Sequence, residues 1–270
     1  MTVAHIVEVD RVPVHLVEAG DGPAVLLLHG SGPGTTGAGA WTATVEALAD
    51  SWRLLAPDHA GFGRTPLPAG SRGGLRDWTD LAAGLMSALG HETYSVVGHS
   101  MGGAVALSLA ATQPDQVNRV VAVSTMGAPG AGLSDGLEAV WAAPPGRAGA
   151  RDMLTRLFHE EAWVTDDAID ARAAAMEAGA SSFAAIFPPP RARWGEDLTL
   201  SRDQLAAIRA PVLLVHGAED RVTPLETSAL PLLTRLADVR LDVFGACGHV
   251  PAVERADDFL RLLREFLRPA

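Results

Sequence analysis

Residues 96–105 read "VVGHSMGGAV", an apolar run, then a serine set between glycines, then a run of small apolar residues. Ser100 with its glycine neighbours fits G-x-S-x-G, and the flanking runs fit a strand before the turn and a helix after it. Such a turn holds the hydroxyl at the carboxyl end of a buried strand, beside a helix N-terminus that favours developing negative charge. We therefore interpret Ser100 as a nucleophile on an α/β sheet.

Apolar runs and helical patterns alternate on both sides of this turn. Residues 5–20 alternate apolar and polar side chains around Asp10 and Arg11, which predicts an antiparallel hairpin. Further strands are expected within 24–30, 53–63, 94–100, 119–125, 211–220 and 239–245. Helices are expected at 75–89, 101–113 and 257–267. The predicted fold class is α/β, with a mostly parallel eight-stranded sheet covered by helices on both faces.

The alternation stops between about 129 and 194. The segment holds "PPGR" and "PPPR", has no convincing strand and reads as short helices carrying five bulky aromatic residues. We predict a helical lid at 129–198, inserted between two parts of one core at 1–128 and 199–270. A disordered insertion is the alternative, but that many aromatic side chains favour a packed element.

Composition narrows the class of protein. The 270 residues carry a net charge of −11, which disfavours nucleic acid as a partner. The sequence has no lysine, so Schiff-base and P-loop chemistry are excluded. No apolar stretch suits a membrane span and the first residues do not resemble a signal peptide. A single cysteine, Cys247, makes a cytoplasmic enzyme the default, and no metal-binding pattern occurs.

A nucleophilic serine needs a base and an orienting acid. His249 follows the last expected strand, and Glu219 and Asp220 follow the strand before it. The order serine, acid, histidine is the order that α/β-hydrolases use. We expect Ser100, His249 and one of the two acids to meet at one cleft.

An oxyanion site needs backbone N–H groups near the nucleophile. Met101, directly after the serine, is expected to supply one. Ser31, in the glycine-rich loop 29–37, is expected to supply the other, because glycines such as Gly32 let the backbone approach a bound carbonyl closely.

Four other polar residues have expected roles outside the triad. His99 either faces the pocket or donates to a backbone carbonyl. His29 and His216 end buried strands and are read as structural or pocket-lining, and Asp58 as a turn former.

The sequence resembles the meta-cleavage-product hydrolases of the α/β-hydrolase superfamily over nearly its whole length. The resemblance rests on "HGSGPGTTGAGAW", "GHSMGG", "LFHEEAWVTDDAIDARAAAM", "HGAEDRVTP" and "CGHVPAVERADDFLRLLREFL". It implies hydrolysis of a carbon–carbon bond in a small, aromatic-derived ring-fission product that bears a carboxylate. It also implies no cofactor, Asp220 as the acid, and a homodimer or larger homo-oligomer.

Arg172 matches the arginine with which the family binds the substrate carboxylate. Its helical neighbours include Ile169 and Met176 but no acid, so this cation lacks a partner on its own helix. A substrate carboxylate is one interpretation. An ion pair elsewhere in the chain, or a side chain reaching solvent, is the other.

Three positions depart from the family pattern. His99 stands where asparagine is usual, Val250 where tryptophan is usual, and Thr42 and Ala43 follow Trp41 where asparagine is usual. All lie at expected substrate-binding positions and make the pocket more apolar. Hydrolysis of an ester, thioester or lactone, and a ligand-binding protein of low turnover, therefore stay open as alternatives.

Overall fold

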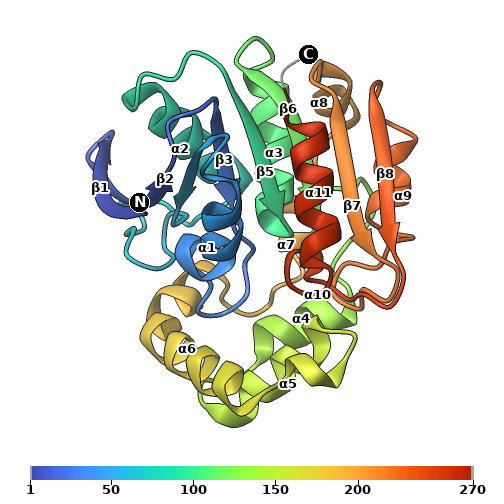
Figure 1. Ribbon diagram of the computed structural model, residues 1–270. Coiled ribbons are helices and arrows are strands. Elements are labelled where there is room, and N and C mark those ends of the chain that lie inside the picture. Colours follow the sequence, from blue (N-terminus) through green and yellow to red (C-terminus); the bar gives the residue numbers. More distant parts are fainter. Residues whose placement is uncertain (1, 269–270) are drawn as a thin grey trace.

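The structure is a computed structural model that describes residues 2–268. One sheet of eight strands has the order β1-β2-β4-β3-β5-β6-β7-β8. The strands are β1 Val3–Val9, β2 Val12–Ala19, β3 Ala24–Leu28, β4 Arg53–Pro57, β5 Tyr94–His99, β6 Val117–Val123, β7 Val212–Gly217 and β8 Val239–Phe244. Strand β2 runs antiparallel to β1 and β4, and β3 to β8 are parallel, so the predicted fold class is confirmed (Figure 1).

Burial explains the sequence pattern of these strands. All five residues of β3 are buried, as expected for a strand covered on both faces, and its sequence is a continuous apolar run. The N-terminal hairpin is different, because β1 is largely exposed and β2 is largely buried. Its reversal falls at Asp10 and Arg11, whose φ angles of 48° and 67° make the tight turn.

Helices cover both faces of the sheet. The three expected helices are α2 Leu75–Ala88, α3 Met101–Thr112 and α11 Ala256–Phe266. Helices α2 and α3 contribute to one apolar core, and α11 packs on the other face with α1 Gly37–Leu48. Short helices α8 Arg202–Ala207, α9 Ala229–Leu233 and α10 Pro251–Glu254 complete this part of the chain.

Helix α1 is absent from the helices that the sequence predicts. Its first turn, "GAGA", reads as a continuation of the glycine loop, because glycine weakens helices. Tertiary packing outweighs this, since Trp41, Val45 and Leu48 are fully buried against the sheet. The Thr36 hydroxyl also caps the helix by accepting from the Gly39 N–H at 3.0 Å.

The segment 129–198, between β6 and β7, is helical throughout its regular structure. It holds α4 Asp135–Ala142, α5 Arg147–Leu157, η1 Glu161–Trp163, α6 Asp166–Ile186 and α7 Trp194–Asp197. Helices α4, α5 and α6 lie beyond the carboxyl ends of the parallel strands (Figure 1). Helix α6 spans 21 residues, so the expectation of short helices is wrong there. Its alanine-rich sequence sustains a long helix because alanine has the highest helix propensity.

The aromatic residues of this segment divide into two groups. Trp141, Phe183 and Phe187 are buried, and the ring centroid of Phe187 lies 4.4 Å from that of Trp141 and 4.7 Å from that of Trp194. Phe158 and Trp163 are more exposed and lie close to each other. The first group joins the segment to the core, and the second stands at a cavity described below.

Candidate active site

Ser100 occupies the junction between β5 and α3. Its φ of 56° and ψ of −117° are unusual for a residue with a side chain, as expected for a strained turn. A Cβ at Gly98 would lie 2.0 Å from the Gly102 carbonyl oxygen, and one at Gly102 would lie 2.3 Å from the Leu28 carbonyl oxygen. The two glycines are therefore required by close backbone contact at the turn.

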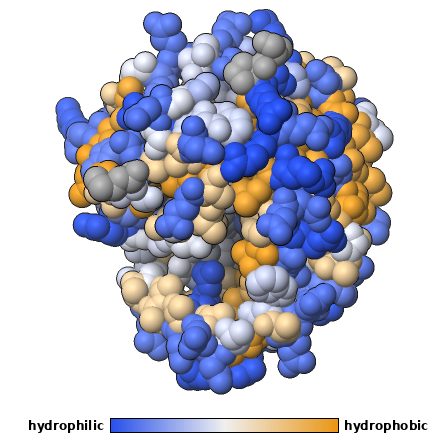
Figure 2. All heavy atoms as spheres, viewed as in Figure 1, coloured by the Kyte–Doolittle hydropathy of each residue, from blue (hydrophilic) through white to orange (hydrophobic). Residues whose placement is uncertain are grey.

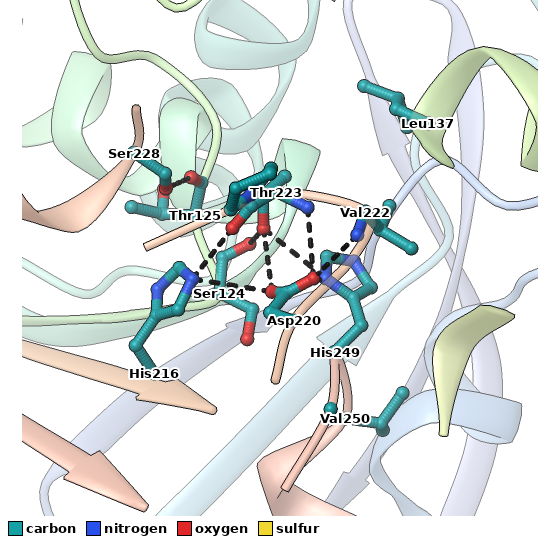
Figure 3. A network of polar contacts seen from close by, with 12 residues as sticks. Ser124, Thr125, Leu137, His216, Asp220, Val222, Thr223, Ser228, His249 and Val250 are labelled. Carbon is teal, nitrogen blue, oxygen red and sulfur yellow. Dashed lines mark hydrogen bonds and ion pairs between the residues drawn. The ribbon is translucent and has the colours of Figure 1, made fainter. Parts of the chain in front are cut away.

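His249 and Asp220 form a hydrogen-bonded pair. The Nδ1 atom of His249 lies 2.9 Å from Oδ2 of Asp220, and both side chains are buried. The other carboxylate oxygen accepts the N–H groups of Val222 at 2.8 Å and Thr223 at 2.9 Å (Figure 3). With Nδ1 donating to the acid, Nε2 of His249 is left for the cavity, which Ser100 also lines.

Asp220 is held in its ionised form. Burial alone would raise the pKa of Asp220, but the neighbouring imidazoles of His249 and His216, with the hydrogen bonds they donate, bring this pKa well below its usual range. A carboxylate stabilised in this way is an acceptor for the Nδ1–H of His249 and fixes the tautomer of the ring.

The sequence does not predict two of the partners of Asp220. The Thr223 hydroxyl donates to Oδ2 of Asp220 at 2.9 Å. His216 places Nε2 2.7 Å from the Thr223 carbonyl oxygen and 3.3 Å from the same carboxylate oxygen. The sequence places His216 at a strand end, but only the fold shows that it lies behind the acid, outside the cavity lining (Figure 3). The signal for Thr223 is its position three residues after Asp220, a spacing typical of a turn in which a carboxylate accepts local groups.

The glycine loop lies beside the serine. A Cβ at Gly30 would come within 3.1 Å of the Ser100 Cβ, so the following Ser31 lies close to the turn. In the part of the chain described, neither the Ser31 N–H nor the Met101 N–H donates a hydrogen bond. The Ser31 hydroxyl accepts from Nε1 of Trp141 at 3.0 Å, which ties α4 to the loop. Two free N–H groups beside one hydroxyl make a suitable arrangement for binding a negative oxygen.

Helix α6 docks directly on this loop. Gly34 has a φ of +75°, and a Cβ there would lie 2.5 Å from the carbonyl carbon of Ala175. The backbone of the loop thus touches the backbone of α6, which only glycine permits. The glycine loop is positioned by the helical segment as well as by the sheet.

A cavity of about 650 Å³ opens between the helical segment and the sheet, where the surface in Figure 2 is hollowed. Ser100, His249, His99, Arg172 and Val250 all line it, as do Ser31, Gly32 and Trp41. Most of the other lining side chains are apolar: Leu137, Val140, Met153, Leu154, Leu157, Phe158, Trp163, Ala168, Ala171, Ala175, Val222, Ala252 and Val253. The expected substrate-binding residues therefore share one largely apolar cavity. Thr42 and Ala43 are not among its lining residues.

Arg172 is the one arginine among the lining residues. Its Nη1 atom donates to the Pro33 carbonyl oxygen at 3.2 Å and to the Thr35 hydroxyl at 3.3 Å. Within residues 2–268 it forms no ion pair with a carboxylate, and burial lowers the pKa of its guanidinium. A cation without a counter-ion in an apolar cavity is costly, so the site favours an anionic ligand.

Both readings of His99 hold at once. The ring lines the cavity, and its Nε2 lies 2.8 Å from the His249 carbonyl oxygen. Burial, with the adjacent His249, lowers the pKa of His99 to about 3, so the ring is neutral near neutral pH.

Two other polar residues hold the loops under the site. His29 lies outside the cavity lining; its Nδ1 is 2.7 Å from the Gly30 carbonyl oxygen, and its Nε2 accepts the His59 N–H at 3.0 Å. Asp58 is more than a turn former: besides the Arg64 N–H of its own turn, it accepts the Gly37 N–H at 2.7 Å and pairs with His15 at 2.9 Å. Cys247 is buried, and burial raises the pKa of its thiol to about 12.

Comparison with known proteins decides the family. The α/β hydrolase fold model matches residues 23–256. The chain is 37% identical to a 2-hydroxy-6-oxo-2,4-heptadienoate hydrolase of Pseudomonas putida F1, over 95% of this chain and 93% of that protein. This chain is a meta-cleavage product hydrolase of the α/β-hydrolase fold family.

Other relatives agree with that assignment. A 2-hydroxymuconate semialdehyde hydrolase of Pseudomonas sp. CF600 is 37% identical over 95% of this hydrolase and 90% of its own length. A crystal structure of the meta-cleavage product hydrolase of Pseudomonas fluorescens IP01 matches with a TM-score of 0.93 and 34% identity, over 97% and 96% of the two chains. The hydrolase therefore shares both sequence and fold with this group along nearly its full length.

Among residues 2–268 no group of three or more His, Cys, Asp or Glu side chains is arranged to hold a metal ion. No helix in that range combines the length and the apolar character needed to cross a bilayer.

Proposed function

We propose that this hydrolase cleaves a carbon–carbon bond in a carboxylate-bearing ring-fission product of the 2-hydroxy-6-oxo-dienoate type. The observation that carries the proposal is Arg172, a cation with no acidic partner in the described chain, in the same cavity as Ser100 and His249. The names of the relatives, a heptadienoate hydrolase and a muconate semialdehyde hydrolase, support a substrate derived from an aromatic ring.

The proposed chemistry uses three side chains in sequence. The dienol is first converted to its keto form, with a proton added at C5, so that the electron pair of the C5–C6 bond can delocalise to the C2 oxygen when that bond breaks. His249 takes the proton of Ser100, or of a water beside it, through Nε2 as the oxygen adds to the ketone at C6, and returns that proton to the departing enolate. Where Ser100 is the nucleophile, a water activated by His249 then hydrolyses the acyl-serine. Asp220 holds the ring by accepting Nδ1–H at 2.9 Å and stabilises the imidazolium that forms during transfer. The acid stays ionised because of the hydrogen bonds and imidazoles around it.

The backbone N–H groups of Ser31 and Met101 are proposed to bind the ketone oxygen under attack. Negative charge develops on that oxygen as the nucleophile adds, and donors held by the protein stabilise it without reorganising. Met101 is the first residue of α3, so the helix dipole contributes in the same direction.

The remaining proposed contacts orient the substrate. Arg172 binds the carboxylate, and the apolar side chains, with Gly32 and Val250, enclose the carbon chain and its substituent. Residues 129–198 would act as a lid on the core formed by 1–128 and 199–270. This lid would exclude bulk water from the cavity, since α6 contacts the glycine loop at Gly34. We also propose that the protein is cytoplasmic and that it forms a homodimer or larger homo-oligomer. Light scattering of the purified protein tests the oligomeric state.

A pair of substrates tests the reaction. The wild-type enzyme should bleach 2-hydroxy-6-oxohepta-2,4-dienoate and release acetate, with a kcat/KM far above that for p-nitrophenyl acetate. Ser100→Ala should lower kcat for the dienoate by about 10⁴- to 10⁶-fold, because the hydroxyl begins the covalent or proton-transfer step. Rapid turnover of the ester with no bleaching of the dienoate would overturn the proposal in favour of an ester hydrolase.

A further inference from the structure

The ring of His99 has a defined tautomer. Its Nε2 lies 2.8 Å from the His249 carbonyl oxygen, which can only accept a hydrogen bond. The proton is therefore on Nε2. Because burial and the neighbouring His249 keep the ring neutral near neutral pH, Nδ1 carries a lone pair and no hydrogen.

That lone pair has no partner in the part of the protein described. No residue from 2 to 268 donates a hydrogen bond to Nδ1 of His99. A Cβ built at Gly30 would lie 3.2 Å from this atom, so Nδ1 faces the glycine loop. Gly30, Ser100 and His249 line the same cavity as His99, and the rings of His99 and His249 have centroids 4.7 Å apart. A lone acceptor thus stands within the cavity, next to the reacting residues.

We infer that Nδ1 of His99 accepts a hydrogen bond from the un-ionised hydroxyl of the substrate, so that this enzyme selects the neutral enol over the dienolate. The inference rests on the proposed function, which supplies a substrate with an acidic hydroxyl. It assigns His99 a direct part in choosing the ionic form that is bound.

The selectivity follows from the bonding capacity of the ring. A neutral enol can donate its hydrogen to Nδ1, whereas a dienolate oxygen has none to donate and would set its negative charge against a lone pair. The ring cannot turn over to offer a donor without losing its bond to the His249 carbonyl. An asparagine at this position carries both an acceptor and a donor, so its amide can serve either form of the substrate.

The absorbance of trapped substrate tests this. In Ser100→Ala, bound 2-hydroxy-6-oxohepta-2,4-dienoate should show the shorter-wavelength enol band even at a pH where the free substrate is the yellow dienolate. Above the pKa of the substrate hydroxyl, the apparent Kd of Ser100→Ala for the substrate should rise about tenfold for each pH unit, because only the protonated substrate binds well. In Ser100→Ala/His99→Asn the bound substrate should keep the dienolate band, and the apparent Kd should change less than about twofold over the same range.

Two results overturn the inference. One is a dienolate band for substrate bound to Ser100→Ala, a measurement that leaves His99 unchanged and so does not depend on how a His99 variant folds. The other is the same band and pH slope in both proteins. His99→Gln, which also carries an amide donor, repeats the comparison if His99→Asn does not fold.

Cleavage by the wild-type enzyme is measured alongside these spectra. If the dienoate is cleaved and the two spectra agree, only the inference about His99 fails. If the dienoate is not cleaved, the proposed function fails and the inference falls with it.

Discussion

The polar atoms of the site form two sides that differ in how they are used: a first group around Asp220, and a second group that faces the ligand. Around Asp220, each carboxylate oxygen accepts hydrogen bonds from within the protein, and His216 and Thr223 support them from behind. In the second group, Arg172 has no counter-ion and Nδ1 of His99 has no donor in the described chain. The first side is complete before any ligand arrives. The second is complete only with a ligand of suitable charge.

Breaking the complete side should have the largest effect. In Asp220→Asn the amide oxygen would keep the backbone N–H groups of Val222 and Thr223, so the NH₂ group would face Nδ1 of His249. The histidine would then adopt the other tautomer and lose its basic Nε2. We expect kcat to fall by about 10³- to 10⁴-fold in steady-state assays.

The adjacent acid supplies the matched control. Glu219 accepts the Cys247 N–H at 3.0 Å, away from the imidazole. Glu219→Gln should therefore keep kcat within a few-fold of the wild type. A larger loss in Glu219→Gln than in Asp220→Asn would reverse the assignment of the acid.

Separating the insertion from the glycine loop should cost less. Gly34→Ala would place a methyl group against the α6 backbone in addition to straining a φ of +75°. Gly70→Ala has a similar φ of +83° but meets no atom within 4 Å, so it measures strain alone. We expect Gly70→Ala to lower the free energy of unfolding by about 1–2 kcal/mol and Gly34→Ala by about 1–3 kcal/mol more, in urea titrations. Equal losses of unfolding free energy in the two variants would show that the contact between the loop and α6 does not contribute to stability.

Neutralising the incomplete side should affect binding. Arg172→Met should raise KM for a carboxylate dienoate by about 10- to 100-fold while leaving hydrolysis of an uncharged ester nearly unchanged. The melting temperature should stay the same or rise, because a half-buried cation without a counter-ion does not stabilise the fold. Arg151→Ala, on the exposed surface of α5, is the control, and a similar rise in KM for both variants would contradict the assignment.

A further effect concerns stability in acid. His99 has a lowered pKa of about 3, so the unfolded chain binds its proton first as the pH falls. The stabilisation is fully present above about pH 6.5 and is lost as the pH falls toward 3, at about 1.4 kcal/mol per pH unit for each such histidine. His99→Asn should lose stability less steeply between pH 6 and 4 than the wild type, measured as urea midpoints. If the stability of both proteins falls equally steeply with pH, His99 is protonated to the same extent in the folded and unfolded states.

The sequence predicts the parts of the site that depend on local pattern. Ser100 is found because a buried strand and a glycine turn leave few other structures possible, and the strand ends bring His249 and Asp220 to the same edge. Helix α1 is missed because its stability comes from Trp41, Val45 and Leu48 packing on the sheet, which no local pattern shows. The orientation of His99 and the contact of His216 with Asp220 depend on neighbours distant in sequence, and so cannot be read from either segment alone.

The hydrogen bonds from Arg172 to Pro33 and Thr35 have a kinetic consequence. The same short loop carries the Ser31 N–H, so the residues that hold the proposed anchor for the anionic end of the substrate lie two and four positions after the proposed donor to the reacting carbonyl. Truncated substrates that lack the acid group should consequently lose turnover as well as affinity, since the energy gained at one end of the loop is used to fix the geometry of the other.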